Sequence, residues 1–217
     1  MPRCVGRGIT AKCLLGIIAN WLLVACTTTL PLKPAFDEPP LTQQIEARVG
    51  SSFAIPVHTF DYVETGGAGS MIRVDFDQVS LARFEQVFSA LFSDVTPLPL
   101  WPPWRETPSE LDGVIELDKA HLAMAVGDDL RNPERVTVSY RVCLYTPEGA
   151  VVNCWESHAE QLHQRAAFES SLSLKSYLNR LIETASREAI ARFMLAFEQD
   201  PAVRAWAEQV AERQRLR

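Results

Sequence analysis

Hydrophobic and polar positions alternate in several stretches of the chain, which predicts β-strands with one buried face. We expect strands at Phe53–Thr59, Met71–Asp77, Arg135–Thr146 and Val151–Ser157, with two more between Gly113 and Val126. In the last of these stretches the apolar positions change from odd to even numbers near Asp118 and Lys119. We therefore expect a bulge or bend there.

The spacing of apolar residues changes to three and four in two other stretches, which predicts amphipathic helices. The first runs over about Ser80–Ser93, with Ser80 as its N-cap. The second carries one apolar stripe over Leu174–Phe197. Asp200 and Pro201 then restart a helix, because Asp is a good N-cap and Pro fits the first helical position.

These elements predict an α+β fold. We expect a two-layer sandwich in which a mostly antiparallel sheet packs amphipathic helices on one face, with a C-terminal helical extension. The chain has 217 residues, of which 47% are hydrophobic and 22% charged, as in ordinary globular proteins. We place a single periplasmic domain at residues 45–217.

The first 25 residues have the pattern of a secretory signal peptide. Arg3, Arg7 and Lys12 come before or at the edge of an apolar run over residues 13–25, and no acidic residue precedes Asp37. An apolar run of about 13 residues is too short for a transmembrane helix, which needs about 20.

The apolar run ends in Leu23-Val24-Ala25-Cys26, which resembles the lipobox of bacterial lipoproteins. The resemblance implies cleavage before Cys26, a diacylglycerol group on its sulfur and an acyl chain such as palmitate on the new amino group. Thr27 stands where inner-membrane lipoproteins often have Asp, which implies sorting to the periplasmic face of the outer membrane. The alternative is an uncleaved anchor, or an ordinary signal with a cysteine at its edge by chance.

Beyond the lipobox, the remainder of the chain resembles small periplasmic α/β envelope lipoprotein domains and the N-terminal domain of the translocation protein TolB. The likeness lies in the order of elements and in short phrases such as Val138-Ser139-Tyr140 and Trp155 around a Gly-containing turn. It assigns no functional residue.

Residues 26–44 are predicted to be a lipidated cysteine followed by a tether. Pro31, Pro34, Pro39 and Pro40 favour an extended, semi-stiff chain and oppose helix. The net charge of −6 argues against a nucleic-acid partner and disfavours adhesion to anionic lipids. The acyl chains are therefore expected to hold the protein on the lipid bilayer.

Few residues form a pattern typical of catalysis. His158 and His163 are the closest pair of histidines, and their spacing of five does not place them on one helix face, so we expect no metal site. The chain has no GxSxG motif, and the glycines around Gly66 lack the lysine of a phosphate-binding loop. We expect neither an enzyme nor a cofactor.

A proline-dense segment from Thr96 to Pro108 has no helix or strand period and offers a candidate contact surface. Its apolar residues are Leu98, Leu100, Trp101 and Trp104. One interpretation is a docking lip for a partner protein or lipid. The other, which we favour, is that these side chains fold back over the core; a large loss of stability in a Trp101→Ala/Trp104→Ala variant would distinguish it.

Cys143 and Cys154 are the thiols that remain once the signal is cut and Cys26 is acylated. A four-residue loop over 147–150 would place them opposite each other, and in an oxidising compartment they would form a disulfide. A three-residue loop would shift the register by one residue and turn the two sulfur atoms to opposite faces. The residues Pro-Glu-Gly at 147–149 suit both loops.

Together these features predict a non-enzymatic outer-membrane lipoprotein that acts as an accessory or scaffold in cell-envelope assembly or transport, with an envelope protein as partner. One alternative is a binding module that holds a small apolar ligand between the sheet and the helices. Another is an envelope hydrolase, which would need histidines and carboxylates gathered in one cleft.

Overall fold

The computed structural model describes residues 27–33, 43–53, 60–63, 71–98, 110–125, 133–164 and 171–216. Within these ranges the chain folds into both strands and helices. The strands are β1 (Thr27–Leu30), β2 (Ile45–Phe53), β3 (Phe60–Val63), β4 (Met71–Val74), β5 (Phe92–Pro97), β6 (Gly113–Ala125), β7 (Glu134–Tyr145) and β8 (Val151–His163). The helices are α2 (Phe76–Leu91), α3 (Ser171–Gln199) and α4 (Pro201–Arg215).

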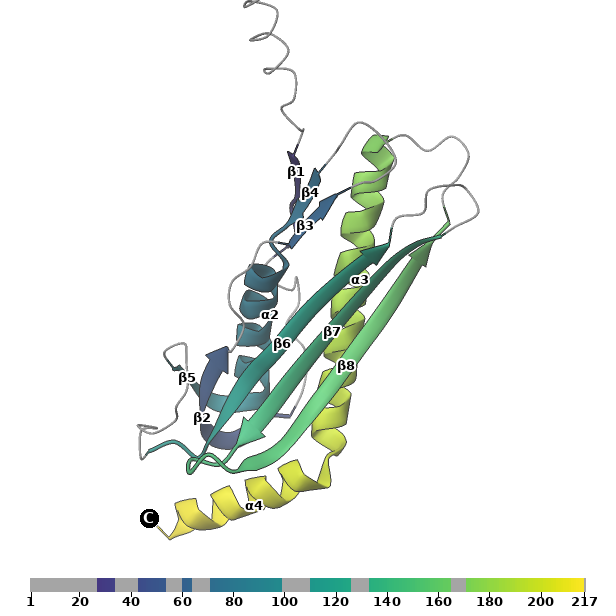
Figure 1. Ribbon diagram of the computed structural model, residues 1–217. Helices are drawn as coiled ribbons and strands as arrows, with labels where there is room; N and C mark the ends of the chain where they lie inside the picture. The colour runs from purple at the N-terminus through teal and green to yellow at the C-terminus, as the bar shows by residue number, and fades with distance from the viewer. Residues whose placement is uncertain are drawn as a thin grey trace, which may run out of the picture.

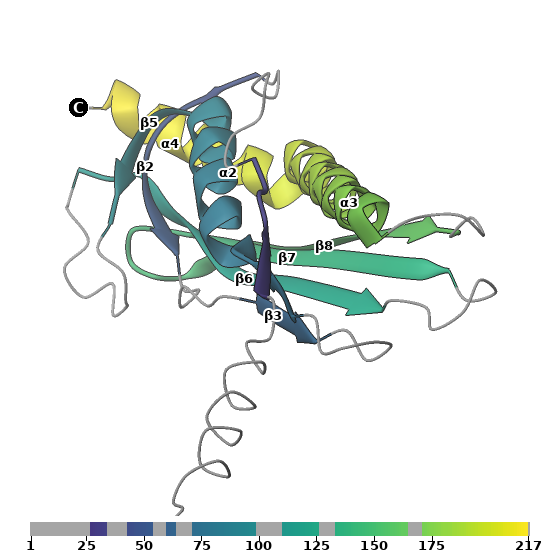
Figure 2. The same cartoon turned by 90° about the horizontal axis from the view of Figure 1, so that it is seen from above.

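The main sheet has the strand order β5-β2-β6-β7-β8. β2 runs parallel to both β5 and β6, whereas β6, β7 and β8 are antiparallel to one another. Helices α2 and α3 cover one face of this sheet (Figure 2), and α4 lies across one end of the molecule (Figure 1). The predicted α+β class, with helices on one face and a C-terminal helical extension, is confirmed; the parallel pairing of β2 makes the sheet mixed.

Aromatic side chains fill the space between the sheet and the helices. The ring of Phe84 on α2 lies 4.9 Å from that of Tyr140 on β7 and 5.9 Å from that of Phe193 on α3. The ring of Trp155 on β8 lies 5.1 Å from that of Phe197 on α3. Each such pair adds about 0.5–1.5 kcal/mol beyond the area that it buries. These contacts fix both helices on the sheet.

A smaller sheet of order β1-β4-β3 contains the beginning of the predicted tether. β1 pairs in parallel with β4, with Thr27 opposite Met71. Leu30 and Leu32 are 3% and 9% exposed, so this segment is part of the folded domain and not a spacer. The tether prediction is wrong here because apolar residues between the prolines have a core to cover. Residues 34–42 lie outside the described part of the chain.

β2 is not among the predicted strands. Ile45, Ala47 and Val49 alternate with Glu46 and Arg48, but small and polar residues occupy the buried positions that follow. Gly50, Ser51 and Ser52 are all buried. A Cβ atom on Gly50 would lie 2.5 Å from Leu98 Cδ1 and 3.0 Å from Leu111 Cδ1, so a larger residue there would have to displace these leucine side chains. The predicted strand over 53–59 overlaps β2 by one residue, and positions 54–59 lie outside the described residues.

Helix α2 begins at Phe76, four residues before its predicted start. The side chain of its N-cap, Asp75, makes no capping hydrogen bond, and Ser80 lies buried inside the helix. Phe76 fits both patterns, since it continues the alternation of β4 and also lies four residues before Ser80 on the buried helix face. β4 therefore ends at Val74. The residues after α2 form β5, although the sequence predicted the end of a helix and the start of a loop there.

Other elements follow the sequence pattern more closely. The stretch predicted as two strands is the single strand β6, and its register against β7 shifts between Leu117 and Lys119, where a bulge is predicted. β8 continues to His163, beyond its predicted end. Asp200 caps α4 and Pro201 lies in its first turn, as predicted.

Candidate functional site

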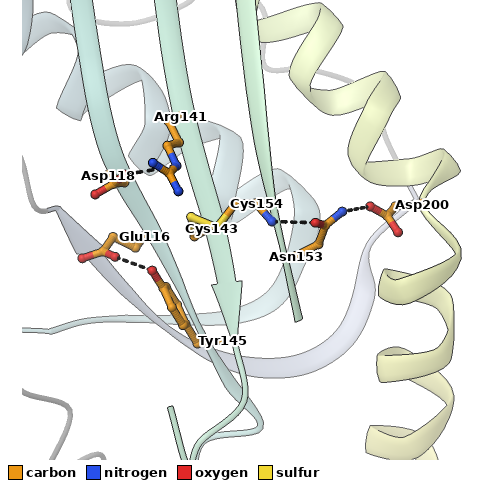
Figure 3. The surroundings of a disulfide bond; sticks show 8 residues. All are labelled: Glu116, Asp118, Arg141, Cys143, Tyr145, Asn153, Cys154 and Asp200. Carbon is orange, nitrogen blue, oxygen red and sulfur yellow. Dashed lines mark hydrogen bonds and ion pairs between the residues drawn. A yellow bond between two sulfur atoms is a disulfide. The ribbon is translucent and has the colours of Figure 1, made fainter. Parts of the chain in front are cut away.

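The β7–β8 hairpin places Cys143 directly opposite Cys154, and the two sulfur atoms are joined at 2.07 Å. The neighbouring side chains of Val142 and Leu144 are fully buried against the helices. Successive side chains of a strand point to opposite faces, so the disulfide lies on the sheet face away from the helices. Figure 3 shows its surroundings.

The tip of this hairpin is a three-residue loop. The N–H of Thr146 donates to the carbonyl of Ala150 at 2.8 Å, and the N–H of Gly149 donates to the carbonyl of Thr146 at 2.9 Å. Gly149 has φ of 86°, the left-handed conformation that such a loop requires at its last position. This loop alone would turn the two cysteines to opposite faces.

A β-bulge beyond the loop restores the register of the cysteines. Tyr145 pairs with Val151. The preceding residue of β7, Leu144, pairs with Asn153 and not with Val152. Val152 is therefore the extra residue of a bulge. The pairing predicted from a four-residue loop is present, but a shorter loop and a bulge produce it.

Asn153, beside the disulfide, connects the hairpin to α4 through Asp200 (Figure 3). Its Oδ1 accepts from the N–H of Cys154 at 2.8 Å, and its Nδ2 donates to the Asp200 carboxylate. Asp200 also accepts from Trp155 Nε1 at 2.9 Å and from the N–H of Ala202 at 2.7 Å. Burial opposes the ionisation of Asp200, but these hydrogen bonds together outweigh it and lower the pKa of Asp200.

A buried carboxyl group lies on the other side of the disulfide. Tyr145 donates its hydroxyl proton to Glu116 Oε2 at 3.1 Å (Figure 3). Burial raises the pKa of Glu116, which is 5% exposed; the hydrogen bond from Tyr145 lowers it, and the charge of Asp118 raises it further. Burial, followed by the charge of Glu116, raises the pKa of Tyr145 to about 12. Asp118 in turn pairs with Arg141 at 3.3 Å.

The disulfide, with its polar neighbours, is suited to a structural role. Each sulfur atom is bonded to the other, so neither is a nucleophile while the bond is intact. Through Asn153 the bonded hairpin also supports the start of α4.

Two histidines line up on the same open face. His121 pairs with Ser139, which pairs with His158. Neighbouring strands lie about 4.8 Å apart, so the Cα atoms of the two histidines are about 10 Å apart, with Ser139 between them. His163 stacks instead on Tyr177, with ring centroids 4.1 Å apart. Among the described residues, no three His, Cys, Asp or Glu side chains are placed to hold a metal ion.

A buried ion pair fastens the chain after β1 to the helices. Arg83 of α2 is 1% exposed and donates through Nη2 to Glu183 of α3 and to the carbonyl of Lys33, the latter at 2.8 Å. The N–H of Lys33 donates to Glu183 Oε1 at 2.8 Å. We call these three residues the Lys33 clamp. One feature of the sequence indicates this clamp. Arg83 lies four residues before Val87 on the buried face of α2, where an apolar residue is expected.

A groove of 570 Å³ lies beside α4, where the helix approaches the end of α3 and the start of β2. Its apolar lining includes Leu91, Phe197, Val203 and Ala207, and its charged lining includes Glu46, Glu198 and Arg204. The groove is not in the layer between sheet and helices, where the sequence predicted a small apolar ligand. The aromatic contacts described above occupy the centre of that layer.

Of the residues predicted to contact a partner, the structure describes one. The N–H of Leu98 donates to the carbonyl of Ser51 at 2.8 Å, and its half-buried side chain lies against Gly50. This position agrees with the interpretation that the segment folds back over the core. Outside the described residues lie Leu100, Trp101, Trp104 and the predicted lipidation site Cys26.

None of the helices in the described ranges is long and apolar enough to cross a membrane. No protein-family model matches the chain, and no curated protein matches it in sequence.

Proposed function

We propose that the chain is an outer-membrane lipoprotein, held on the periplasmic face by an acylated Cys26, whose domain is a non-enzymatic accessory or scaffold in envelope assembly or transport. The observation that carries the proposal is Leu23-Val24-Ala25-Cys26 at the end of a short apolar run behind basic residues. Each buried methylene of an acyl chain contributes about 0.8 kcal/mol, so one chain binds marginally and two or three bind firmly.

Two features of the described residues fit this proposal. Disulfides persist in oxidising compartments such as the bacterial periplasm, and Cys143 is bonded to Cys154. On the open face, charged side chains form ion pairs, including Arg141 with Asp118 and Arg135 with Glu160. Both features suit a rigid domain with a polar outer surface.

Acylation is tested by growing cells with a fatty-acid probe and comparing the wild type with Cys26→Ala. We expect the wild type to be labelled and Cys26→Ala to be unprocessed and unlabelled, because the acylated sulfur and the cleavage site are both lost. Equal labelling of the two proteins would contradict the proposal. A Thr27→Asp variant is the matched control: it should be labelled but retained in the inner membrane.

The groove beside α4 favours a second candidate function, binding of a small apolar ligand. Its 570 Å³ lie within the range of about 300–1,000 Å³ found for small-molecule sites. Leu91, Phe197 and Val203 give it an apolar lining. If the groove binds such ligands, Ala207→Trp should fill it and abolish binding of a fluorescent fatty-acid analogue; an unchanged affinity would exclude this site.

A further inference from the structure

We propose that the acylated N-terminus holds the folded domain directly on the bilayer, with the β1 end of the molecule against the lipid headgroups and α4 at the far end. This inference rests on the proposed lipidation of Cys26. Beyond the lipidation, it specifies which surface of the domain meets the membrane and in which direction the domain extends from the bilayer.

The residue that follows Cys26, Thr27, already belongs to strand β1. Thr27 is already paired with Met71 between β1 and β4. Consecutive Cα atoms are about 3.8 Å apart, so the start of β1 stays close to an acylated Cys26.

The Lys33 clamp prevents the segment after β1 from acting as a flexible spacer. Both backbone groups of Lys33 are hydrogen bonded, the N–H to Glu183 and the carbonyl to Arg83. Leu30 and Leu32 are buried on either side of Pro31. Releasing β1 would therefore expose two leucines and break the two hydrogen bonds that Lys33 makes with Glu183 and Arg83, which opposes release.

Figure 1 shows which elements share the β1 end of the molecule. The β3–β4 sheet, the N-terminal end of α3 and the C-terminal end of β8 lie at this end, and α4 lies at the other. Helix α3 has 29 residues and spans about 43 Å at about 1.5 Å per residue. An anchor at β1 therefore presents α4 and its groove roughly 40 Å away from the anchored end.

Side chains near the β1 end have the chemistry of a membrane–water interface. Leu162 of β8 is 53% exposed. The ring of Tyr177 stacks on His163 and lies 5.7 Å from the guanidinium carbon of Arg180. Amphipathic aromatic residues and arginine are favoured at headgroup level, where their apolar parts contact lipid and their polar parts contact water. This end is thus suited to lie against headgroups.

Energy transfer to the membrane surface tests this orientation. The full-length acylated protein is reconstituted in phosphatidylethanolamine–phosphatidylglycerol vesicles that contain an acceptor-labelled lipid. A donor dye is attached through Leu162→Cys near the anchored end or Ala205→Cys on α4; both positions are exposed. The disulfide and the acylated Cys26 leave the introduced cysteine as the thiol for labelling. We expect a larger loss of donor emission at position 162 than at position 205.

A Gly/Ser spacer between Cys26 and Thr27 provides the control. About 30 such residues have a mean span of about 30 Å, so the spacer should reduce the difference between the two positions. Equal loss of emission at both positions in the protein without the spacer, or a difference that the spacer leaves undiminished, would overturn the inference. The mass of Cys26 is measured first: an unacylated cysteine would overturn the proposed function as well, whereas acylation with equal transfer would overturn this inference alone.

Discussion

Asp200 is a single residue on which the position of α4 depends. It accepts hydrogen bonds from Asn153 and Trp155 of β8 and from the N–H of Ala202 in the first turn of α4. One carboxylate therefore caps the last helix and binds it to the edge strand of the sheet.

We predict that Asp200→Ala lowers the free energy of unfolding by about 1–3 kcal/mol at pH 7, because it removes the helix cap and leaves the Trp155 N–H without its acceptor. The pKa of Asp200 lies below its ordinary value of 3.8. The ionised Asp200 therefore contributes to the free energy of unfolding above pH 3.8, and this contribution is lost as the pH falls through the lowered pKa. The free energies of unfolding of the wild type and the variant, measured in urea, should therefore become equal in acid. A gap as large at pH 2 as at pH 7 would contradict this account, and Glu208→Ala, at an exposed position of α4, is the control.

The pKa of Glu116 is shifted in the opposite direction from that of Asp200. Its pKa is raised above 4.5 by burial, so the folded state favours the protonated form and stability falls as the pH rises through the raised pKa. We predict that Glu116→Gln is more stable than the wild type at pH 8 and that the advantage disappears below about pH 4. Urea midpoints across this range measure the effect. Glu156→Gln, at an exposed position, should show no such advantage; a pH-independent difference for Glu116→Gln would count against a raised pKa.

At the scale of elements, the disulfide fixes the β7–β8 hairpin. Cys143 and Cys154 are separated by 11 positions in sequence. Closing so short a loop stabilises the folded state by about 3 kcal/mol in the chain-entropy model. We predict this loss for Cys143→Ala/Cys154→Ala. Thiol counting on the denatured, unreduced protein without its signal should find no free thiol, and two should appear after reduction; two free thiols before reduction would exclude the bond.

The Lys33 clamp connects β1 to both α2 and α3. We predict that Arg83→Met costs about 1.5–3 kcal/mol, because it leaves the half-buried Glu183 and the carbonyl of Lys33 without their hydrogen-bond donor. Arg83→Met/Glu183→Leu should cost less than the sum of the two single changes, as a double-mutant cycle would measure. Lys33→Ala should be much milder, since the clamp contacts the backbone of that residue. Additive losses would show that the two side chains do not interact.

Elements with a long, uninterrupted hydrophobic period could be predicted from the sequence, and elements that depend on distant contacts could not. β7, α3 and α4 each bury one regular face, which the spacing of apolar residues shows directly. β2 was not predicted because its second half buries Gly50, Ser51 and Ser52, and Gly50 packs against Leu98 and Leu111, which are remote in sequence. The predicted start of α2 is four residues too late, because Phe76 fits the spacing of a strand and that of a helix equally well.

The same reasons apply to the candidate sites. The two cysteines could be paired from the sequence only by assuming a loop length, because the bulge at Val152 has no signal of its own. The Lys33 clamp depends on residues in three separate segments and on backbone atoms. The helical spacing places Arg83 on the buried face of α2, but it does not identify the partners of Arg83. The packing of Leu30 and Leu32 was hidden by the prolines around them, which favour an extended chain whether or not it is buried.

With Cys26 acylated, the whole molecule would be attached to the bilayer at its β1 end and free at its α4 end. The acyl chains would hold the β1 end, and the long axis of α3 would carry α4 and its groove away from the bilayer (Figure 1). A partner that binds at α4 would then have to lie about 40 Å from the headgroups, given the length of α3. The orientation depends on a single chemical event at Cys26.

The intact mass of the protein extracted from membranes tests that event most directly. We expect a chain that begins at Cys26 and carries a diacylglyceryl group and an N-linked acyl chain, with one disulfide. Fragmentation should place the whole lipid mass on Cys26 and none on Thr27 or beyond. A chain that still carries residues 1–25, or one that begins at Cys26 without lipid, would contradict the account.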